Sequence, residues 1–204
     1  MTLTSFKRSS INDDTRYVNM LVGNAAYEPS QFYSIATVVG TGTAAALEFT
    51  SIPSTYKHLQ IRYYIRGYDT ASRANDDLRI RFNNDTTNAN YQGHFLQGDG
   101  ATVTATAAAG VSAGGQIVIS ETIPGSTAAA NIMAVGYIDI LDYASTTKNK
   151  TVKFTTGNDR NGSGQIRSGS VSYLSTTAIS SIQLRPDPTG FTTTSTFALY
   201  GIKG

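Results

Sequence analysis

A strict alternation of apolar and polar residues between His58 and Asn83 constrains the fold of this chain more than any other feature. Apolar side chains recur at every second position of two runs: Leu59, Ile61, Tyr63 and Ile65 in the first, and Leu78, Ile80 and Phe82 in the second. A period of two places these side chains on one face of a strand and the intervening polar ones on the other. We therefore expect two strands that pair antiparallel and share one buried face.

Similar strand-like runs follow one another along most of the chain, separated by turn residues. The runs outside the first pair are 33–39, 45–51, 90–97, 116–123, 131–141, 150–156, 165–174, 178–185 and 196–203. Residues 98–115 have few large side chains and read as a loop or a weak edge strand. No segment shows a capped helical period. The sequence predicts an all-β fold, an antiparallel β-sandwich of about ten strands resembling a jelly roll, in which 131–141, the most apolar run, is central.

The N-terminal region differs from the rest of the chain. Hydrophobic residues are sparse in 1–32, apart from the short apolar segment Tyr17–Val22. We expect an extended N-terminal arm at 1–32 and a β-sandwich domain at 33–204. The arm is either a floppy terminus or a segment that docks on a neighbouring subunit, and we favour docking. Its predicted contact residues are Tyr17, Val18, Met20 and Leu21.

Composition excludes several classes of protein. The chain has no cysteine, which excludes disulfides, thiolate metal sites and a cysteine nucleophile. A formal net charge of +2 is too small to indicate nucleic acid or an anionic membrane as the main partner. No apolar run is long enough to cross a membrane as a helix, and the N-terminus shows no apolar signal core.

Residues that could carry catalysis or bind a metal are few. The two histidines, His58 and His94, lack metal-ligand spacing, and no nucleotide-binding loop or nucleophile elbow is present. Glycosidases need only two carboxylates, and the candidates are Asp76, Asp77, Asp99, Glu121, Asp139 and Asp142. We favour hydrogen-bonding roles for them, including Asp139 at the end of its strand. The Asx-rich turns near 83–90 and 159–161 could hold calcium, but Asx residues are also the default chemistry of turns. We expect no enzyme activity and no cofactor.

Four arginines follow the polar side of the first two runs: Arg62, Arg66, Arg79 and Arg81. If the runs pair, these like charges stand close together and destabilise the sheet unless acids lie nearby. A nucleic-acid groove would need more aromatic residues and a stronger positive charge. We therefore predict that these arginines pair with acidic groups of the same chain or of a neighbouring subunit. Alternatively, their stems pack flat against a second sheet.

Three stretches in a fixed order resemble small structural proteins of tailed bacteriophages, notably those that infect cyanobacteria and other aquatic bacteria. They are FYSIATVVGTGTAAALEFTSIPSTYKHLQIRYYIRG (32–67), VGYIDILDYASTTKNKTVKFTTG (135–157) and TTAISSIQLRPDPTGFTTTSTFALYGIKG (176–204). Residues 1–31 are outside this resemblance.

The resemblance implies a non-enzymatic virion protein with a jelly-roll-like sandwich. Proteins of this kind act as capsid decoration (cement) proteins or as outer modules of fibres and spikes, and they commonly form homotrimers. A fibre subunit would carry a repetitive shaft, which this chain lacks, so we favour a cement protein that contacts the major capsid protein or other virion proteins. The alternative is a tail fibre, spike or receptor-binding module whose exposed Tyr and Asn contact a host-surface polysaccharide.

Overall fold

Antiparallel strands make up nearly all the regular structure in the described part of the chain. The computed structural model describes residues 32–204, except 44, 69–71, 108–110, 113 and 188–189. Its elements are β1 (Phe32–Val39), β2 (Leu47–Phe49), β3 (His58–Ile65), β4 (Gly67–Tyr68), β5 (Asn75–Phe82), the 3₁₀ helix η2 (Asn88–Asn90), β6 (Tyr91–Gly98), β7 (Val103–Ala107), β8 (Val111–Ser112), β9 (Gln116–Pro124), β10 (Ala134–Leu141), β11 (Lys150–Asp159), β12 (Gly164–Tyr173), β13 (Ile182–Asp187), β14 (Gly190–Phe191) and β15 (Thr196–Ile202). The predicted all-β class is confirmed.

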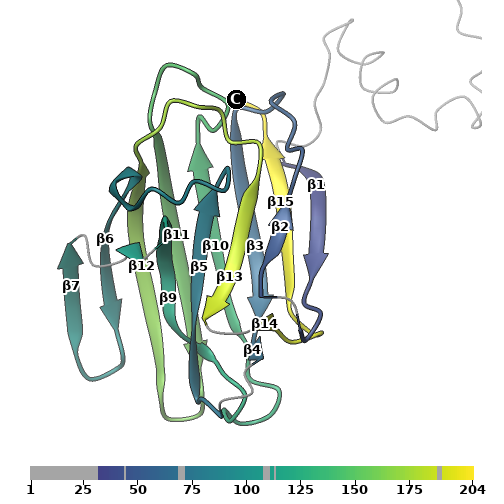
Figure 1. Ribbon diagram of the computed structural model, residues 1–204. Helices are drawn as coiled ribbons and strands as arrows, with labels where there is room; N and C mark the ends of the chain where they lie inside the picture. Colours follow the sequence, from purple (N-terminus) through teal and green to yellow (C-terminus); the bar gives the residue numbers. More distant parts are fainter. Residues whose placement is uncertain (1–31, 44, 69–71, 108–110, 113, 188–189) are drawn as a thin grey trace, which may run out of the picture. The chain divides into compact units, whose positions relative to one another are not determined.

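The strands form two large sheets of unequal width. The wider sheet has eight strands in the order β1-β15-β3-β10-β11-β12-β6-β7, and the narrower has five in the order β2-β13-β5-β9-β8. A small third sheet pairs β14 with β4. Figure 1 shows β13, β5 and β9 lying in front of the wider sheet, with β6 and β7 at its left edge. The arrangement is a β-sandwich, in which each sheet covers the apolar face of the other.

One hydrophobic cluster fills the space between the sheets. Every second side chain of β3 and β5 points into it, as the alternation predicts. Three aromatic rings from both sheets meet there: the centroid of Tyr173 lies 5.4 Å from that of Phe82 and 5.1 Å from that of Tyr91. The hydroxyl oxygen of Tyr91 also accepts a hydrogen bond from the Phe82 amide at 3.2 Å. Aromatic contacts therefore join β5 of one sheet to β6 and β12 of the other.

The predicted pairing of the first two runs is wrong. β3 pairs with β10 and β15 in the wider sheet, whereas β5 pairs with β13 and β9 in the narrower one. Between them the chain leaves the wider sheet through β4, which pairs with β14. Alternation shows that each strand has one buried face. It does not show whether two such strands pair within one sheet or face each other across the core. The two apolar faces therefore meet across the core.

Most of the other expected strands are present close to their predicted positions. β10 is central, between β3 and β11, as its apolar sequence indicates. The segment 98–115, read as a loop or a weak edge strand, contains β7 at the edge of the wider sheet and the two-residue β8. The arm residues Tyr17, Val18, Met20 and Leu21 lie outside the described residues.

Replacing Ile61 by alanine should test the importance of the core. Ile61 is fully buried on β3, between β10 and β15. We expect Ile61→Ala to lower the free energy of unfolding by about 2–5 kcal/mol, because it removes apolar contacts and leaves a cavity. Replacement of the exposed Val39 on β1 by alanine should alter it by less than about 0.5 kcal/mol. Urea denaturation of both variants measures this difference, and equal effects would contradict the assignment.

Candidate functional site

The outer face of the wider sheet carries many large apolar side chains. On the side away from the core, its strands expose Tyr64, Leu96, Val103, Val135, Tyr137, Leu141 and Ile166. Between them lie small polar residues of β11 and β12, such as Thr151 and Ser170. Single exposed apolar residues are normal on a protein, but several large ones on a single face indicate an interaction surface. This outer face is therefore the broadest candidate binding surface in the described part of the chain.

Arg62 stands within a group of aromatic and polar side chains on this face. Its Nε donates a hydrogen bond to the Gln60 side-chain oxygen at 2.7 Å, and Gln60 in turn donates to Asp139 at 2.7 Å. The Arg62 guanidinium carbon lies 5.7 Å from the centroid of the Tyr200 ring. Tyr137 is the direct cross-strand neighbour of Arg62 on β10. We call Gln60, Arg62, Tyr137, Asp139 and Tyr200 the Arg62 patch.

The Arg62 patch can bind a partner in two ways. It borders a shallow groove of about 420 Å³ that is lined by Gln60, Arg62, Tyr63, Val135, Gly136 and Tyr137. Tyrosine and arginine are the residue types that most often dominate the binding energy of protein interfaces. The same flat rings, with a hydrogen-bonding network beside them, also suit a sugar. The Gln60 bonds hold Arg62 in place, which lowers the entropy cost of binding for either partner.

The four arginines predicted to form one row lie on different faces of the sandwich. Because β3 and β5 belong to different sheets, Arg62 lies on the outer face of the wider sheet, and Arg79 and Arg81 lie on that of the narrower sheet. Arg79 pairs through Nη2 with Asp77 at 2.9 Å and with Asp187, so carboxylates of its own chain neutralise its charge. That outcome is one of the two kinds of pairing that the sequence predicted.

Arg66 and Arg81 bind main-chain carbonyls instead of acids. Arg66 donates to the carbonyls of Ala128 and Ala129 at 2.6 and 2.7 Å, in the loop between β9 and β10. Arg81 donates to the carbonyl of Gly114 at 2.5 Å and to that of Gly115 at 3.2 Å. Both arginines therefore hold loops of their own chain, and a subunit contact through them stays a prediction.

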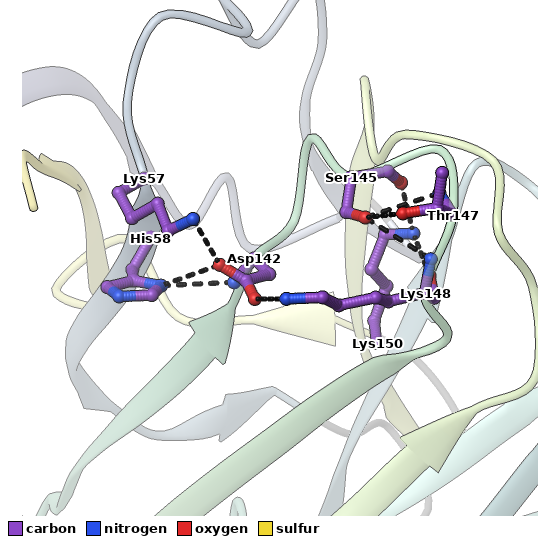
Figure 2. Close-up of polar contacts among 7 residues, drawn as sticks. All are labelled: Lys57, His58, Asp142, Ser145, Thr147, Lys148 and Lys150. Carbon is purple, nitrogen blue, oxygen red and sulfur yellow. Dashed lines mark hydrogen bonds and ion pairs between the residues drawn. The ribbon is translucent and has the colours of Figure 1, made fainter.

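A second polar cluster surrounds Asp142, at the turn that follows β10 (Figure 2). Lys57 and Lys148 approach the two carboxylate oxygens at 3.1 and 2.9 Å. The Asp142 amide donates to His58 Nδ1 at 3.0 Å, so this nitrogen is an acceptor. The hydrogen bonds from Lys148 and Lys57 lower the pKa of the Asp142 carboxyl to about 2. Asp142 thus joins the start of β3 to the loop between β10 and β11, and ion pairing occupies its carboxylate.

The same loop is organised around the buried ammonium group of Lys150. Its Nζ donates to the carbonyls of Ser145, Lys148 and Ser175 at 2.7, 2.9 and 3.3 Å. Figure 2 shows the first two of these bonds below the turn. Lys150 alternates in phase with the inward-pointing Val152 and Phe154. That phase could have identified Lys150 as a buried residue from the sequence.

Arg167 is a second buried cation that sequence reasoning missed. It lies inside the sandwich, with its guanidinium carbon 3.3 Å from the centroid of the Phe95 ring and its Nη1 3.5 Å from Glu121. It shares its phase on β12 with the buried Val171 and Tyr173, which again was the available signal. The pair does not resemble a catalytic dyad, because Glu121 is matched with a cation and not with a second carboxylate.

Two of the remaining candidate carboxylates, Asp85 and Asp76, accept hydrogen bonds in a turn and at the end of a strand. Asp85 accepts hydrogen bonds from the Thr87 amide and from Asn90 and Tyr173, as an Asx residue in a turn does. Asp76 accepts from the amides of Asp77 and Asp187 at 2.8 and 2.9 Å. Among the described residues, no group of three His, Cys, Asp or Glu side chains is placed to hold a metal ion. In that same part of the chain, no helix is long and apolar enough to span a membrane.

Comparison of the chain with protein families, curated proteins and solved structures finds no match. The resemblance to phage structural proteins therefore stays a prediction from the sequence.

Replacing Asp142 by asparagine should reduce the loss in free energy of unfolding that occurs as the pH falls from 4 to 2. The folded-state pKa of Asp142, about 2, lies below its ordinary value of 3.8. Its contribution to stability is therefore complete above about pH 4 and is lost as the pH falls through 2. Asparagine tolerates the positive φ of 48° at this position. We expect the wild type to lose more stability between pH 4 and pH 2 than Asp142→Asn does, measured by urea denaturation. This role would be contradicted if Asp142→Asn and Lys148→Gln both showed the same dependence of unfolding free energy on pH as the wild type.

Replacing Lys150 by methionine should weaken the fold, because three carbonyls lose their donor. We expect a loss of about 3 kcal/mol in the free energy of unfolding, since hydrogen bonds to charged groups contribute about 1.5–3 kcal/mol. Lys153, exposed on the same strand, is the matched control, and Lys153→Met should change stability by less than about 0.5 kcal/mol. Equal stabilities of the two variants in denaturant titrations would show that the ammonium does not organise the loop.

Proposed function

We propose that this chain is a non-enzymatic structural protein of a virus particle, a decoration (cement) protein of a tailed-phage head. The observation that carries the proposal is the outer face of the wider sheet. It exposes large apolar side chains across five strands and includes the Arg62 patch, whose composition is that of a protein-binding surface. The major capsid protein, or another virion protein, is the proposed partner, and the N-terminal arm and the outer face of the wider sheet make the contact.

The order of the strands supports this assignment. Eight of the strands, taken as β1-β15-β3-β10 in one sheet and β2-β13-β5-β9 in the other, follow the order of a jelly roll. In that reading β6, β7 and β8 are an insertion between β5 and β9, and β11 and β12 are an insertion between β10 and β13. The jelly roll is a recurrent fold of viral capsid domains and of lectins. Fold alone does not assign a function, so the exposed face is the stronger argument.

A cement protein works by mass action. A partner that binds the assembled shell, and not its separated subunits, stabilises the shell in proportion to its concentration and affinity. Such a partner needs a broad contact surface and no catalytic group. In the proposed arrangement, copies of the chain bind the outside of the assembled head and contribute no catalytic group.

The second candidate is a receptor-binding module of the tail, either a fibre or a spike. The Arg62 patch favours it, because Tyr137 and Tyr200 flank a polar network on a shallow groove and could stack on sugar rings. Copy number separates the two candidates. A head decoration protein occurs in hundreds of copies per particle, whereas a tail module occurs in a few tens or fewer.

Deletion of residues 1–31 and reversal of the charge at Arg62 test the proposed function. Undecorated heads of the source phage are incubated with wild type, the truncated chain and Arg62→Glu, and bound protein is quantified after sedimentation. We expect the truncated chain to fold but to bind weakly, and Arg62→Glu to lose at least about tenfold in affinity. Arg185→Glu, the same change on the narrower sheet, should bind like the wild type.

Two results would overturn the cement assignment. One is full binding by the truncated chain together with Arg62→Glu. The other is a particle that contains only a few copies of the protein and in which binding to host polysaccharide depends on Tyr137; that result would establish the receptor-binding role instead.

A further inference from the structure

Among the described residues, β7 forms an open edge of the wider sheet. It pairs on one side with β6, from His94 opposite Ala107 to Gly98 opposite Val103, and it is the last strand of the sheet. Edge strands are normally protected by charges, proline, bulges or very short length. β7 reads Val-Thr-Ala-Thr-Ala, without charge or proline, and its register with β6 is regular. The edges of the narrower sheet, β2 and β8, have only three and two residues.

The hairpin that joins β6 to β7 shows which main-chain groups are free. The Asp99 amide donates to the Thr102 carbonyl at 3.2 Å and closes the turn. In an antiparallel pair, hydrogen-bonded and non-hydrogen-bonded positions alternate. Counting from the turn, Thr104 and Thr106 direct their main-chain groups toward β6. Val103, Ala105 and Ala107 therefore direct their N–H and C=O groups away from the sheet.

These free groups match a second copy of the same strand. If two β7 strands run antiparallel with Ala105 opposite Ala105, then Val103 of each copy faces Ala107 of the other. This register pairs all three free residues and makes six main-chain hydrogen bonds, two for each hydrogen-bonded pair. It also places Thr104 opposite Thr106, a favourable cross-strand pair. A shift by one residue in either direction leaves part of this edge unpaired.

The neighbouring side chains favour burial of this edge. Val103, Ile166 and Leu96 are the most exposed large apolar residues in the described part of the chain, at 73%, 62% and 54%. Val103 and Ile166 lie on either side of Gly98, and Leu96 is opposite Ala105, all on the outer face. A two-fold axis perpendicular to the sheet would keep the outer faces of both copies on one side and join these apolar residues into a continuous strip.

We propose that two copies of this chain associate through antiparallel pairing of β7 about a two-fold axis at Ala105, so that the two wider sheets become one continuous sheet. The contact is isologous, because the same strand contributes from both copies. It follows from the edge alone and does not depend on the proposed function, so failure of either proposal leaves the other standing.

A lysine at the two-fold axis tests the contact. The full-length wild type should sediment as a concentration-dependent dimer in analytical ultracentrifugation. Ala105→Lys sets two like charges directly opposite each other and should raise the dimer dissociation constant by at least about tenfold. Ser172→Lys, the same kind of change on the same face but two strands from the edge and opposite the uncharged Thr151 and Gln92, should dimerise like the wild type. Circular dichroism of all three proteins should show equal strand content.

Cysteine cross-linking tests the register, because the natural chain has no cysteine. Ala105→Cys should be joined rapidly by a short bis-maleimide, since hydrogen-bonded partners have Cα atoms about 5.5 Å apart. Ser170→Cys should not be joined, because five strand spacings of about 4.8 Å would separate its two copies. The proposal fails if the wild type is monomeric at all concentrations, if Ala105→Lys leaves the mass of the oligomer unchanged, or if both cysteine variants cross-link at the same rate.

Discussion

The structure depends on one constraint: two sheets must bury their apolar faces against each other although one is wider. The five-stranded sheet packs on the inner face of the eight-stranded one, and the aromatic group of Phe82, Tyr91 and Tyr173 joins the two sheets within the core. Arg167 on β12 is buried between the two sheets, where its guanidinium packs on Phe95 of β6 and approaches Glu121 of β9. The difference in width accounts for strands of the wider sheet, such as the edge strand β7, that have no counterpart in the narrower sheet.

Three cationic side chains in the described part of this protein bind main-chain carbonyls of its own loops. Arg66, Arg81 and Lys150 each donate to two or more main-chain carbonyls of loops. In a fold with many connections and few helices, loop carbonyls need donors that the sheet ladders do not provide. Among the four arginines that the sequence singled out, Arg62 differs from the others because its contacts leave the guanidinium on an exposed face beside aromatic rings. Whether an arginine holds a loop of its own chain or faces a possible partner depends on its place in the fold, not on the residue type.

Sequence reasoning located strands well but could not pair them. Alternation in Leu59–Ile65 and Leu78–Phe82 fixed which side chains are buried, because the side-chain period of a strand is a local property. The choice of partner strand depends on where the chain crosses between sheets, and no local pattern at Gly67–Tyr68 indicates that crossing. Lys150 and Arg167 were overlooked because a cation was assumed to point outward, although each lies in phase with buried neighbours. Of the Arg62 patch, only Arg62 was predicted as a contact residue, since Tyr137, Asp139 and Tyr200 come from strands that are far away in the sequence.

The ammonium group of Lys150 holds the loop after β10 without a bound ion. Many surface loops of this shape are held by a calcium ion that carbonyl oxygens surround. Here the central cation is covalently part of the chain, so it cannot be diluted, exchanged or removed by chelators. The hydrogen bonds that Lys150 makes to this loop are consequently set at the moment of folding and need no bound metal ion.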